Sequence, residues 1–348
     1  MVNSQGNEQK FDRRDSRWQP RKAVANFHTS VLADEVCEAL VPALSPSSEG
    51  TLVDATCGGG GHIAALAQAG ACLREVLAFD RDADALAHAA KRLGDLNCPL
   101  RMFHAPFSTL ASRLDELVVG GERERSEVSA IIADLGVSSH QLDEMPRGFS
   151  FRGDAPLDMR MDPSRGAPLS ERLAELDVKA LAGVLRRYGE EPDASRIAAA
   201  IVQAGPRRTA ELAAVVEAAM SAPQRRRLGR RIHPATRTFQ ALRIWLNDEL
   251  GELERLLDSA PDLLVVGGRL GVITFHSLED RCVKHRFRAL TRRPEAALRM
   301  PVPEAELMPL RFAIPKGWAN GRVATPAETA ANPRARSARL RVLERRAP

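Results

Sequence analysis

TLVDATCGGGGH, residues 51–62, is the stretch that decides the fold class. Its apolar half is typical of a buried parallel strand, and its glycines let the backbone turn sharply and approach a ligand closely. A helical pattern follows from Ile63 to Ala69, so the glycine-rich turn lies between a strand and the N–H groups of a helix N-terminus. The stretch therefore predicts the first strand–helix unit of a ligand-binding α/β sheet.

The strand-then-helix pattern recurs along the next part of the chain. Further strands are predicted at residues 75–79, 100–104 and 130–133, and helices at residues 30–44, 82–93 and 107–118. Strands that alternate with helices form a parallel sheet, whose ligands bind at the carboxyl ends of the strands. We expect a Rossmann-like, doubly wound α/β sheet with its site at that edge.

The pattern changes after residue 144. Residues 145–166 are rich in Pro, Gly, Arg and Asp and predict a long loop, and residues 169–222 have a helical pattern throughout. One long amphipathic helix is expected over residues 238–257. A strand follows at residues 268–275, the tail from Pro294 to Thr329 is expected to be irregular, and residues 338–343 are a candidate final strand.

This order predicts a sheet that is interrupted by a helical unit and then resumes. The expected parts are a flexible N-terminal extension (residues 1–25), a discontinuous α/β domain (residues 26–144 and 246–348) and an inserted helical substrate-recognition domain (residues 145–245). The chain is long enough for about two such domains.

Composition excludes several classes of protein. Hydrophobic residues are 44% and charged residues 27% of the 348 residues, which excludes wholesale disorder. There is no apolar run of membrane-spanning length, and the N-terminus is polar, so we expect neither a membrane association nor a secretion signal, and we expect a cytoplasmic protein. The five cysteines form no CxxC pair, which argues against a disulfide framework and against a metal site.

Arginine is unusually frequent, with 44 Arg among the 50 basic residues and a net charge of +5. A GC-rich genome produces such usage without any functional cause, whereas phosphate recognition favours the guanidinium fork. The arginines cluster: residues 224–243 contain seven Arg and no acid, residues 281–293 contain six basic residues and no acid, and residues 332–348 contain six Arg. This clustering indicates a nucleic-acid partner, although composition alone leaves both explanations open.

The acids at the strand ends indicate a nucleoside-containing cofactor. Asp80 ends the second predicted strand, where an acid accepts hydrogen bonds from ribose hydroxyls. Gly59, Gly61 and Ala64 satisfy a relaxed dinucleotide fingerprint, so a nicotinamide enzyme stays open. Asp54, at the end of the first strand, is instead characteristic of S-adenosylmethionine sites.

The fourth predicted strand ends in DLGVSSHQ, residues 134–141. A carboxylate followed by small residues suits the hydrogen bonding of an exocyclic amine and leaves room for a planar base. The alternative is that this Asp–Gly turn has no function in catalysis.

Taken together, the motifs resemble those of the RsmH (MraW) family, bacterial methyltransferases that modify the N4 amine of a cytidine in 16S ribosomal RNA. The matching stretches run in family order from Phe27 to Arg341 and include DATCGGGGHI (54–63), AFDRDADAL (78–86), HAPF (104–107), DLGVSSHQLD (134–143), PLDMRMD (156–162), HPATRTFQALRIWLNDEL (233–250) and GRLGVITFHSLEDRCVK (268–284). The resemblance implies a class I methyltransferase fold, S-adenosylmethionine as cofactor, and cytosine 1402 in the decoding region of the small ribosomal subunit as target.

The resemblance also implies roles for individual residues. The cofactor-binding positions that it implies are Gly60, Gly61, His62, Asp80 for the ribose, Phe107 near the adenine, Asp134 and Gln141. The chain departs from the commoner pattern at Ala55, Cys57, Ile63 and His140, and none of these changes removes a charged or glycine position.

The chemistry of the acceptor suggests the catalytic residues. The N4 lone pair of cytosine is delocalised into the ring, so a hydrogen-bond acceptor on the N4–H group would localise it. We expect Asp134 or a nearby backbone carbonyl to be this acceptor, with Ser138 and Ser139 shaping the pocket. No catalytic Cys is needed at an exocyclic amine, and Cys57 is interpreted as a packing residue.

Two groups of residues admit two interpretations each. His233, Arg237, Arg243, His276 and Arg281 are candidates for binding RNA or framing a flipped cytidine, whereas His276 and Arg281 with Glu279 could form an internal polar network. The methionines of PLDMRMD pack the insertion against the sheet or line a substrate path.

Other functions remain open at this stage. Methylation of DNA or protein is one, although the DNA enzymes commonly carry a Pro-Pro-aromatic motif where residues 135–137 read Leu-Gly-Val. An RNA-assembly factor without turnover and a nicotinamide dehydrogenase are the others. The expected partner is 16S rRNA or the small ribosomal subunit, with no obligate protein partner evident.

Overall fold

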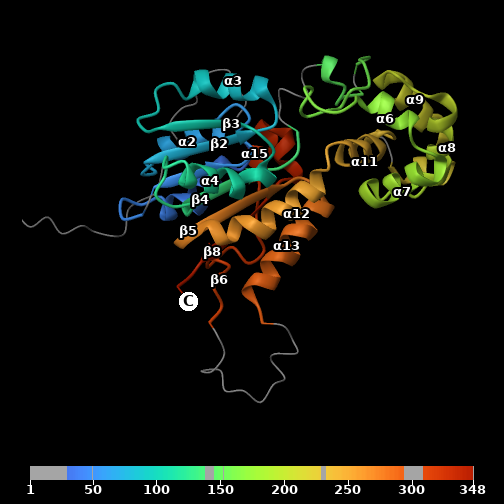
Figure 1. Ribbon diagram of the computed structural model, residues 1–348. Coiled ribbons are helices and arrows are strands. Elements are labelled where there is room, and N and C mark those ends of the chain that lie inside the picture. Colours follow the sequence, from blue (N-terminus) through green and yellow to red (C-terminus); the bar gives the residue numbers. More distant parts are fainter. Residues whose placement is uncertain are drawn as a thin grey trace, which may run out of the picture.

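The computed structural model describes residues 30–48, 50–137, 145–151, 153–228, 233–293 and 309–347. Its centre is one sheet with the strand order β3-β2-β1-β4-β5-β8-β6, and β7 pairs with β8 (Figure 1). The strands are β1 Thr51–Asp54, β2 Glu75–Asp80, β3 Leu100–His104, β4 Val128–Asp134, β5 Leu264–Thr274, β6 Phe312–Ala313, β7 Arg322–Val323 and β8 Arg339–Arg345. The first five are parallel, and β8 runs antiparallel to β5. The predicted α/β fold is confirmed, and so is the final strand.

Helices cover both faces of the sheet, as the alternation of its strand residues requires. Leu52 points into one apolar cluster and Val53 into the other. The first cluster is closed by α1 (Ala33–Leu40), α2 (Gly61–Gln68) and α3 (Ala83–Arg92). The second is closed by α4 (Leu110–Val119), α12 (Glu249–Ser259) and α13 (Ser277–Thr291). Both faces are therefore buried, as in other parallel sheets.

A third apolar cluster is built from residues between Phe149 and Leu242. Its helices are α6 (Leu169–Ala174), α7 (Val178–Gly189), α8 (Ala194–Ala204), α9 (Thr209–Ala219) and α11 (Thr236–Leu246), with α10 (Ala222–Leu228) after α9. Figure 1 shows these helices to one side of the sheet, connected to it through α11 and α12. A separate core supports the predicted inserted domain, whose boundaries stay a prediction, and residues 1–25 lie outside the described part of the chain.

The long helix predicted over residues 238–257 is wrong. The chain forms two helices, α11 and α12, that break at Asn247 and Asp248, where Asp248 has a left-handed backbone with φ of 49°. The Asn247 side chain accepts from the Met161 N–H at 2.8 Å and donates to the Met159 carbonyl at 2.9 Å. These tertiary bonds to another segment override a helical pattern that continues in the sequence.

Smaller differences lie at the edges of the predicted elements. β5 begins at Leu264 rather than at residue 268, and the described part of the tail, predicted to be irregular, contains β6, β7 and the short helix α15 (Pro326–Ala331). In the described residues, no helix is both long and apolar enough to span a membrane.

Candidate cofactor and acceptor site

Three acids lie at the carboxyl edge of adjacent parallel strands. Asp54, the last residue of β1, is in register with Ala78 of β2 and with Ile132 of β4. Asp80 and Asp134 each lie two residues farther along those strands, one on either side of β1. The predicted strand-end acids are thus brought to one place by the sheet register, without any adjustment of loops.

The glycine-rich turn is fastened to β2. The Cys57 N–H donates to the Phe79 carbonyl at 2.8 Å, and the Gly58 N–H donates to Asp80 Oδ2 at 2.7 Å. Gly60 has a left-handed φ of 74°, and a Cβ there would lie 2.8 Å from Leu93 Cδ1. Gly59 faces open space, with no atom within 4 Å of the position of a Cβ. Glycine is therefore needed at residue 60 by the fold, and at residue 59 the backbone is left accessible to a ligand.

His62, in the first turn of α2, contacts one of the acids. Its Nε2 lies 3.3 Å from Asp134 Oδ2, and the residue is 4% exposed. Thr56 connects Asp54 with Asp134, since its N–H donates to Asp54 Oδ1 at 3.1 Å and its hydroxyl oxygen accepts from the Asp134 N–H at 2.6 Å. Asp54 Oδ2, His62 Nδ1 and Asp134 Oδ1 are buried and have no partner within the described residues.

Burial changes the acidity of this cluster. Desolvation raises the pKa of Asp54 to about 7 and that of Asp80 to about 6. Burial lowers the pKa of His62, but the hydrogen bond to Asp134 and the charges of Asp134 and Asp54 outweigh it, so the net shift is upward. The free protein thus holds buried acids at the cost of desolvation, and a cationic ligand would relieve that cost.

The acceptor oxygens of these acids fit the charged and hydroxyl groups of S-adenosylmethionine. The oxygens of Asp54 and Asp134 that have no partner in the described residues suit a positively charged ligand, and Asp80 ends β2, a position from which an acid can accept hydrogen bonds from ribose hydroxyls. Phe107 follows β3, is half-buried, and has the Arg81 guanidinium 5.9 Å from its ring centroid. Within the described residues, no group of three or more His, Cys, Asp or Glu is arranged to hold a metal.

Part of the predicted acceptor site cannot be placed. Ser138, Ser139, His140 and Gln141 lie in residues 138–144, outside the described part of the chain. Cys57 is buried in the first apolar cluster, as expected of a packing residue. Thr56 was not singled out in the sequence, although its position between Asp54 and the glycines was a signal for its linking role.

The second group of candidates separates in the structure. Glu279 is 2% exposed, accepts from the Phe275 N–H at 2.8 Å, and contacts His276 in a capping box at the start of α13. Burial would raise the pKa of Glu279, but the bond and charge of His276, the Phe275 N–H and the charge of Arg243 together outweigh it, and the pKa falls. Arg243 makes two 2.8 Å bonds to Glu249. These contacts favour the internal network for His276 and Glu279 and show that Arg243 is half-buried and paired within the chain.

The remaining candidates, His233, Arg237 and Arg281, contact residues of the predicted insertion. Arg281 pairs with Glu190 at 3.2 Å, and Arg237 donates to the Glu190 carbonyl at 3.3 Å. His233 is exposed and stacks on Phe151 with 4.4 Å between ring centroids. Arg237 and Arg281 therefore meet at the end of α7, and His233 stacks on Phe151; within the described residues, no hydrogen bond or ion pair joins any of the three to the acids of the strand tips.

The methionines of the PLDMRMD stretch are packing residues. Met159 and Met161 are 1% and 6% exposed and belong to the third apolar cluster. The basic clusters are also partly structural, because Arg341 pairs with Asp280 at 2.7 Å. Arg226 and Arg227, in α10, stay exposed.

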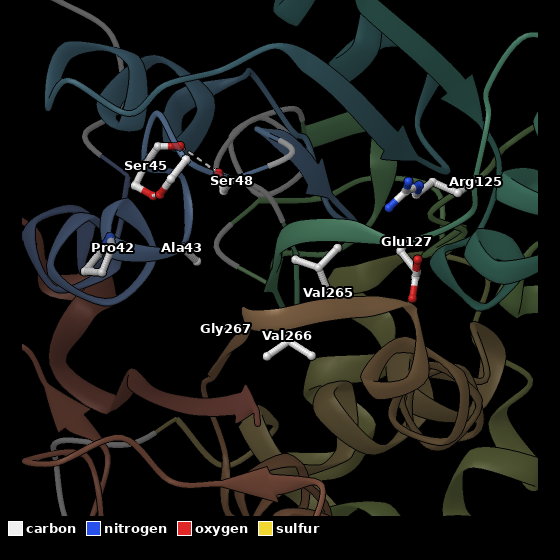
Figure 2. Close-up of a pocket in the computed structure, with 10 residues that line it drawn as sticks. Pro42, Ala43, Ser45, Ser48, Arg125, Glu127, Val265, Val266 and Gly267 are labelled. Carbon is white, nitrogen blue, oxygen red and sulfur yellow. Dashed lines mark hydrogen bonds between the residues drawn. The ribbon is translucent and has the colours of Figure 1, made fainter. Parts of the chain in front are cut away.

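One cavity lies at the opposite edge of the sheet from the acids. It has a volume of about 510 Å³ and is lined by Pro42, Ala43, Ser45, Ser47, Ser48, Arg125, Glu127, Val265, Val266 and Gly267 (Figure 2). These residues precede β1 and β4 or belong to the beginning of β5, so the cavity is at the amino ends of parallel strands. It is separate from the candidate site.

Comparison with known proteins shows which family has a similar sequence. The model of the MraW methylase family matches residues 25–346. The ribosomal RNA small subunit methyltransferase H of Azoarcus sp. (strain BH72) is 49% identical over 325 residues, which cover 91% of this chain and 96% of that relative. The proteins of the same name from Geobacter sp. (strain M21) and Thiobacillus denitrificans are 43% and 45% identical, over 91% of this chain and 98% and 97% of those relatives.

Proposed function

The chain belongs to the MraW methylase family, and from that premise we propose that it transfers a methyl group from S-adenosylmethionine to the N4 amine of a cytidine in 16S rRNA, at cytosine 1402. The observation that carries the proposal is the carboxylate of Asp134 at the tip of β4, with one oxygen held near His62 and the other buried without a partner among the described residues. A methylase has no use for the nicotinamide chemistry that the glycine pattern alone left open.

Each predicted cofactor residue has a defined task in this proposal. Asp80 binds the ribose hydroxyls, and its carboxylate is already oriented by two N–H donors, Gly58 at 2.7 Å and Asp82 at 2.9 Å. The residues that we assign to the rest of the cofactor are Gly60, Gly61 and His62 of the turn, Phe107 near the adenine, Asp134 and Gln141. When bound, S-adenosylmethionine supplies a methyl group that its sulfonium has already activated.

Asp134 serves the acceptor. One proton must leave N4 as the bond to the methyl carbon forms, and Asp134 Oδ1 is the acceptor that no protein donor occupies in the described residues. Accepting the N4–H localises the nitrogen lone pair before transfer and takes up the proton afterwards. Ser138 is assigned to shaping the pocket of the base.

His62 supports this task from the other side of the carboxylate. Because its Nε2 contacts Asp134 Oδ2, a proton held there fixes the orientation of the carboxylate and stabilises its negative charge. Although burial lowers the pKa of His62, the bond to Asp134 and the charges of Asp134 and Asp54 raise it overall, which favours the form that carries this proton.

The insertion, residues 145–245, is proposed to recognise the rRNA of the small subunit. Its α10 presents Arg226 and Arg227 to solvent, and guanidinium groups there suit phosphate contacts. The proposal places the protein in the cytoplasm, where its substrate is, and requires no obligate protein partner.

The decisive test is transfer of labelled methyl from S-adenosylmethionine to small ribosomal subunits and to free 16S rRNA. Nucleoside analysis is expected to show N4-methylcytidine. Label in another nucleoside, in DNA or in protein would replace the proposed target, and the absence of label from every acceptor would favour an assembly factor without turnover.

A further inference from the structure

The strand tip that carries the proposed ribose acid is also the place where the insertion is attached. Asp80 is followed directly by Arg81 and Asp82, and both side chains reach segments that begin or end the insertion. In this turn, Asp80 belongs to the proposed cofactor site, and Arg81 and Asp82 contact the insertion and its ends.

Arg147 makes the first attachment. It lies just before the PLDMRMD stretch and donates through Nη1 to Asp82 Oδ2 at 2.8 Å. Through Nη2 it donates to the carbonyls of Arg160 at 3.2 Å and Met161 at 3.0 Å. The side chains of Arg147 and Asp82 are 11% and 2% exposed. One guanidinium therefore joins the tip of β2 to two parts of the insertion.

Arg81 makes the second attachment. It donates to the Asn247 carbonyl at 2.9 Å and pairs with Glu252 at 3.2 Å. Asn247 is the residue at which α11 ends, and its side chain holds Met159 and Met161. The entry and the exit of the insertion are thus fastened to each other and to β2 by a single polar network.

A network of this kind specifies geometry more than it adds stability. Ion pairs this far from solvent lose much of their attraction to desolvation, but their directional bonds allow one arrangement only. Asp82 also caps α3 by accepting from the Asp84 N–H at 3.1 Å, so its carboxylate is oriented by its own helix as well as by Arg147. The Arg147–Asp82 pair is therefore held in place on the side of β2.

We propose that Arg147 is a positioning residue, which holds the helical insertion at a fixed place relative to the cofactor-binding tip of β2 and thereby aligns the RNA with Asp134. The inference rests on the proposed function. The hydrogen bonds and the ring contact of the Arg147 side chain within the described residues are with Asp82, Phe149 and the carbonyls of residues 160 and 161, so we expect its effect on the placement of the acceptor and not on the affinity for the cofactor.

The test replaces Arg147 by Met in the full-length protein. We expect the dissociation constant for S-adenosylhomocysteine, measured by calorimetry, to change less than about threefold, since Asp80 keeps both of its donors. We expect kcat/KM for small ribosomal subunits to fall about 10- to 100-fold, because a small displacement of reactants is costly. Amide hydrogen exchange of residues 158–162 should become faster.

Arg165→Met is the matched control in the same loop. Arg165 is 70% exposed and pairs only with Asp162 among the described residues, so its loss should leave kcat/KM and hydrogen exchange unchanged. If Arg147→Met does not fold, Arg147→Lys keeps the charge without the fork and is expected to show the same separation of kcat/KM from cofactor affinity.

Two results overturn the inference. One is an Arg147→Met protein with the turnover and hydrogen exchange of the wild type. The other is a parallel loss of cofactor affinity and turnover, in either Arg147 variant, which would make the residue part of the cofactor site or of the general fold. Failure of the wild-type protein to methylate N4 is a separate outcome that rejects the proposed function, while the calorimetry and exchange data still report on the Arg147–Asp82 pair.

Discussion

The carboxylates at the strand tips and those that support the neighbouring loops have opposite environments. Burial raises the pKa of Asp54 and Asp80, and one oxygen of Asp54 has no partner in the described residues. Burial acts on Asp158 and Glu279 as well, but their partners outweigh it and the pKa falls. Asp158 receives two 2.7 Å bonds from Arg160.

The difference separates residues that wait for a ligand from residues that complete the fold. Asp158 and Glu279 are paired within the chain, whereas one oxygen of Asp54 has no donor in the described residues. An incomplete set of donors costs stability in the free protein and is tolerated where a bound ligand completes the set. Pairing within the chain thus distinguishes these two groups of acids, and composition and charge counts do not contain it.

The largest effect on turnover is expected from Asp134→Asn, which tests the acids at the strand tips. Loss of the carboxylate removes the proton acceptor while keeping the shape, so kcat should fall about 10²- to 10⁴-fold. Because Asp134 also belongs to the predicted cofactor site, the cofactor dissociation constant must be measured in parallel. The matched control is Asp158→Asn, which should lower the melting temperature and retain turnover by the folded protein. Near wild-type turnover in Asp134→Asn would remove this residue from the mechanism.

Asp80→Asn is expected to have the next largest effect, and on binding rather than on chemistry. The amide keeps one acceptor oxygen for the two N–H donors that now meet the carboxylate, and it loses the charge that ribose hydroxyls favour. Charged hydrogen bonds of this type are worth about 1.5–3 kcal/mol, so cofactor affinity should fall roughly 10- to 100-fold. Calorimetry with S-adenosylhomocysteine measures this, and an unchanged affinity would show that Asp80 serves only to hold the glycine turn.

The sequence was sufficient to predict β1 to β5 and β8, because these strands follow local patterns, whereas β6 and β7 were missed. Of the short apolar runs that identified β1 to β5, those of β1, β2 and β4 end in acids, and the parallel register brings Asp54, Asp80 and Asp134 together. The contacts that the sequence could not predict are long-range. Asn247 breaks an otherwise continuous helical pattern because it bonds to residues almost ninety positions away, and no local propensity records such a partner.

The same limit applied to the arginines. Arg243 and Arg341 belonged to clusters that suggested RNA, but each is held by a carboxylate of the chain itself. Frequency and clustering describe how many guanidinium groups are present. Only the fold determines which of them have a partner, and hence which can bind a phosphate.

The dependence of stability on pH sharpens the comparison between the two sets of acids. Asp54 has a pKa of about 7 when folded and an ordinary value of 3.8, so between these values the folded state holds a proton that the unfolded state has released. Its contribution to stability therefore decreases as pH rises from about 4 to about 7, by about 1.4 kcal/mol per pH unit. Asp54→Asn should remove this decrease.

Glu279→Gln is expected to change the pH dependence of the unfolding free energy in the opposite direction to Asp54→Asn. The folded pKa of Glu279 lies below its ordinary value of 4.5, so its contribution is present above that value and is lost as pH falls through the folded pKa. Urea unfolding of wild type and both variants, from below the folded pKa of Glu279 up to pH 8, measures these slopes. Parallel curves for all three proteins would contradict the assigned environments.

The smallest effect is expected from changes to exposed arginines, which extend the comparison from acidic to basic side chains. Arg226 and Arg227 are exposed on α10, and neither makes an ion pair with the described residues, whereas Arg225 donates to the Glu217 carbonyl at 2.6 Å. Reversal to Glu at residues 226 and 227 should weaken RNA binding by several-fold at low salt, and should reduce the slope of log affinity against log salt by up to about two. Cofactor affinity should not change.

Arg74→Glu with Arg125→Glu is the control for that pair, since it alters the net charge equally at the amino edge of the sheet, away from the strand tips. If both double variants reduce RNA affinity alike, the effect is one of overall charge, and the exposed arginines of α10 are ordinary surface. A change confined to the α10 variant would instead mean that freedom from internal partners identifies the RNA-binding arginines, as it identifies the ligand-facing acids.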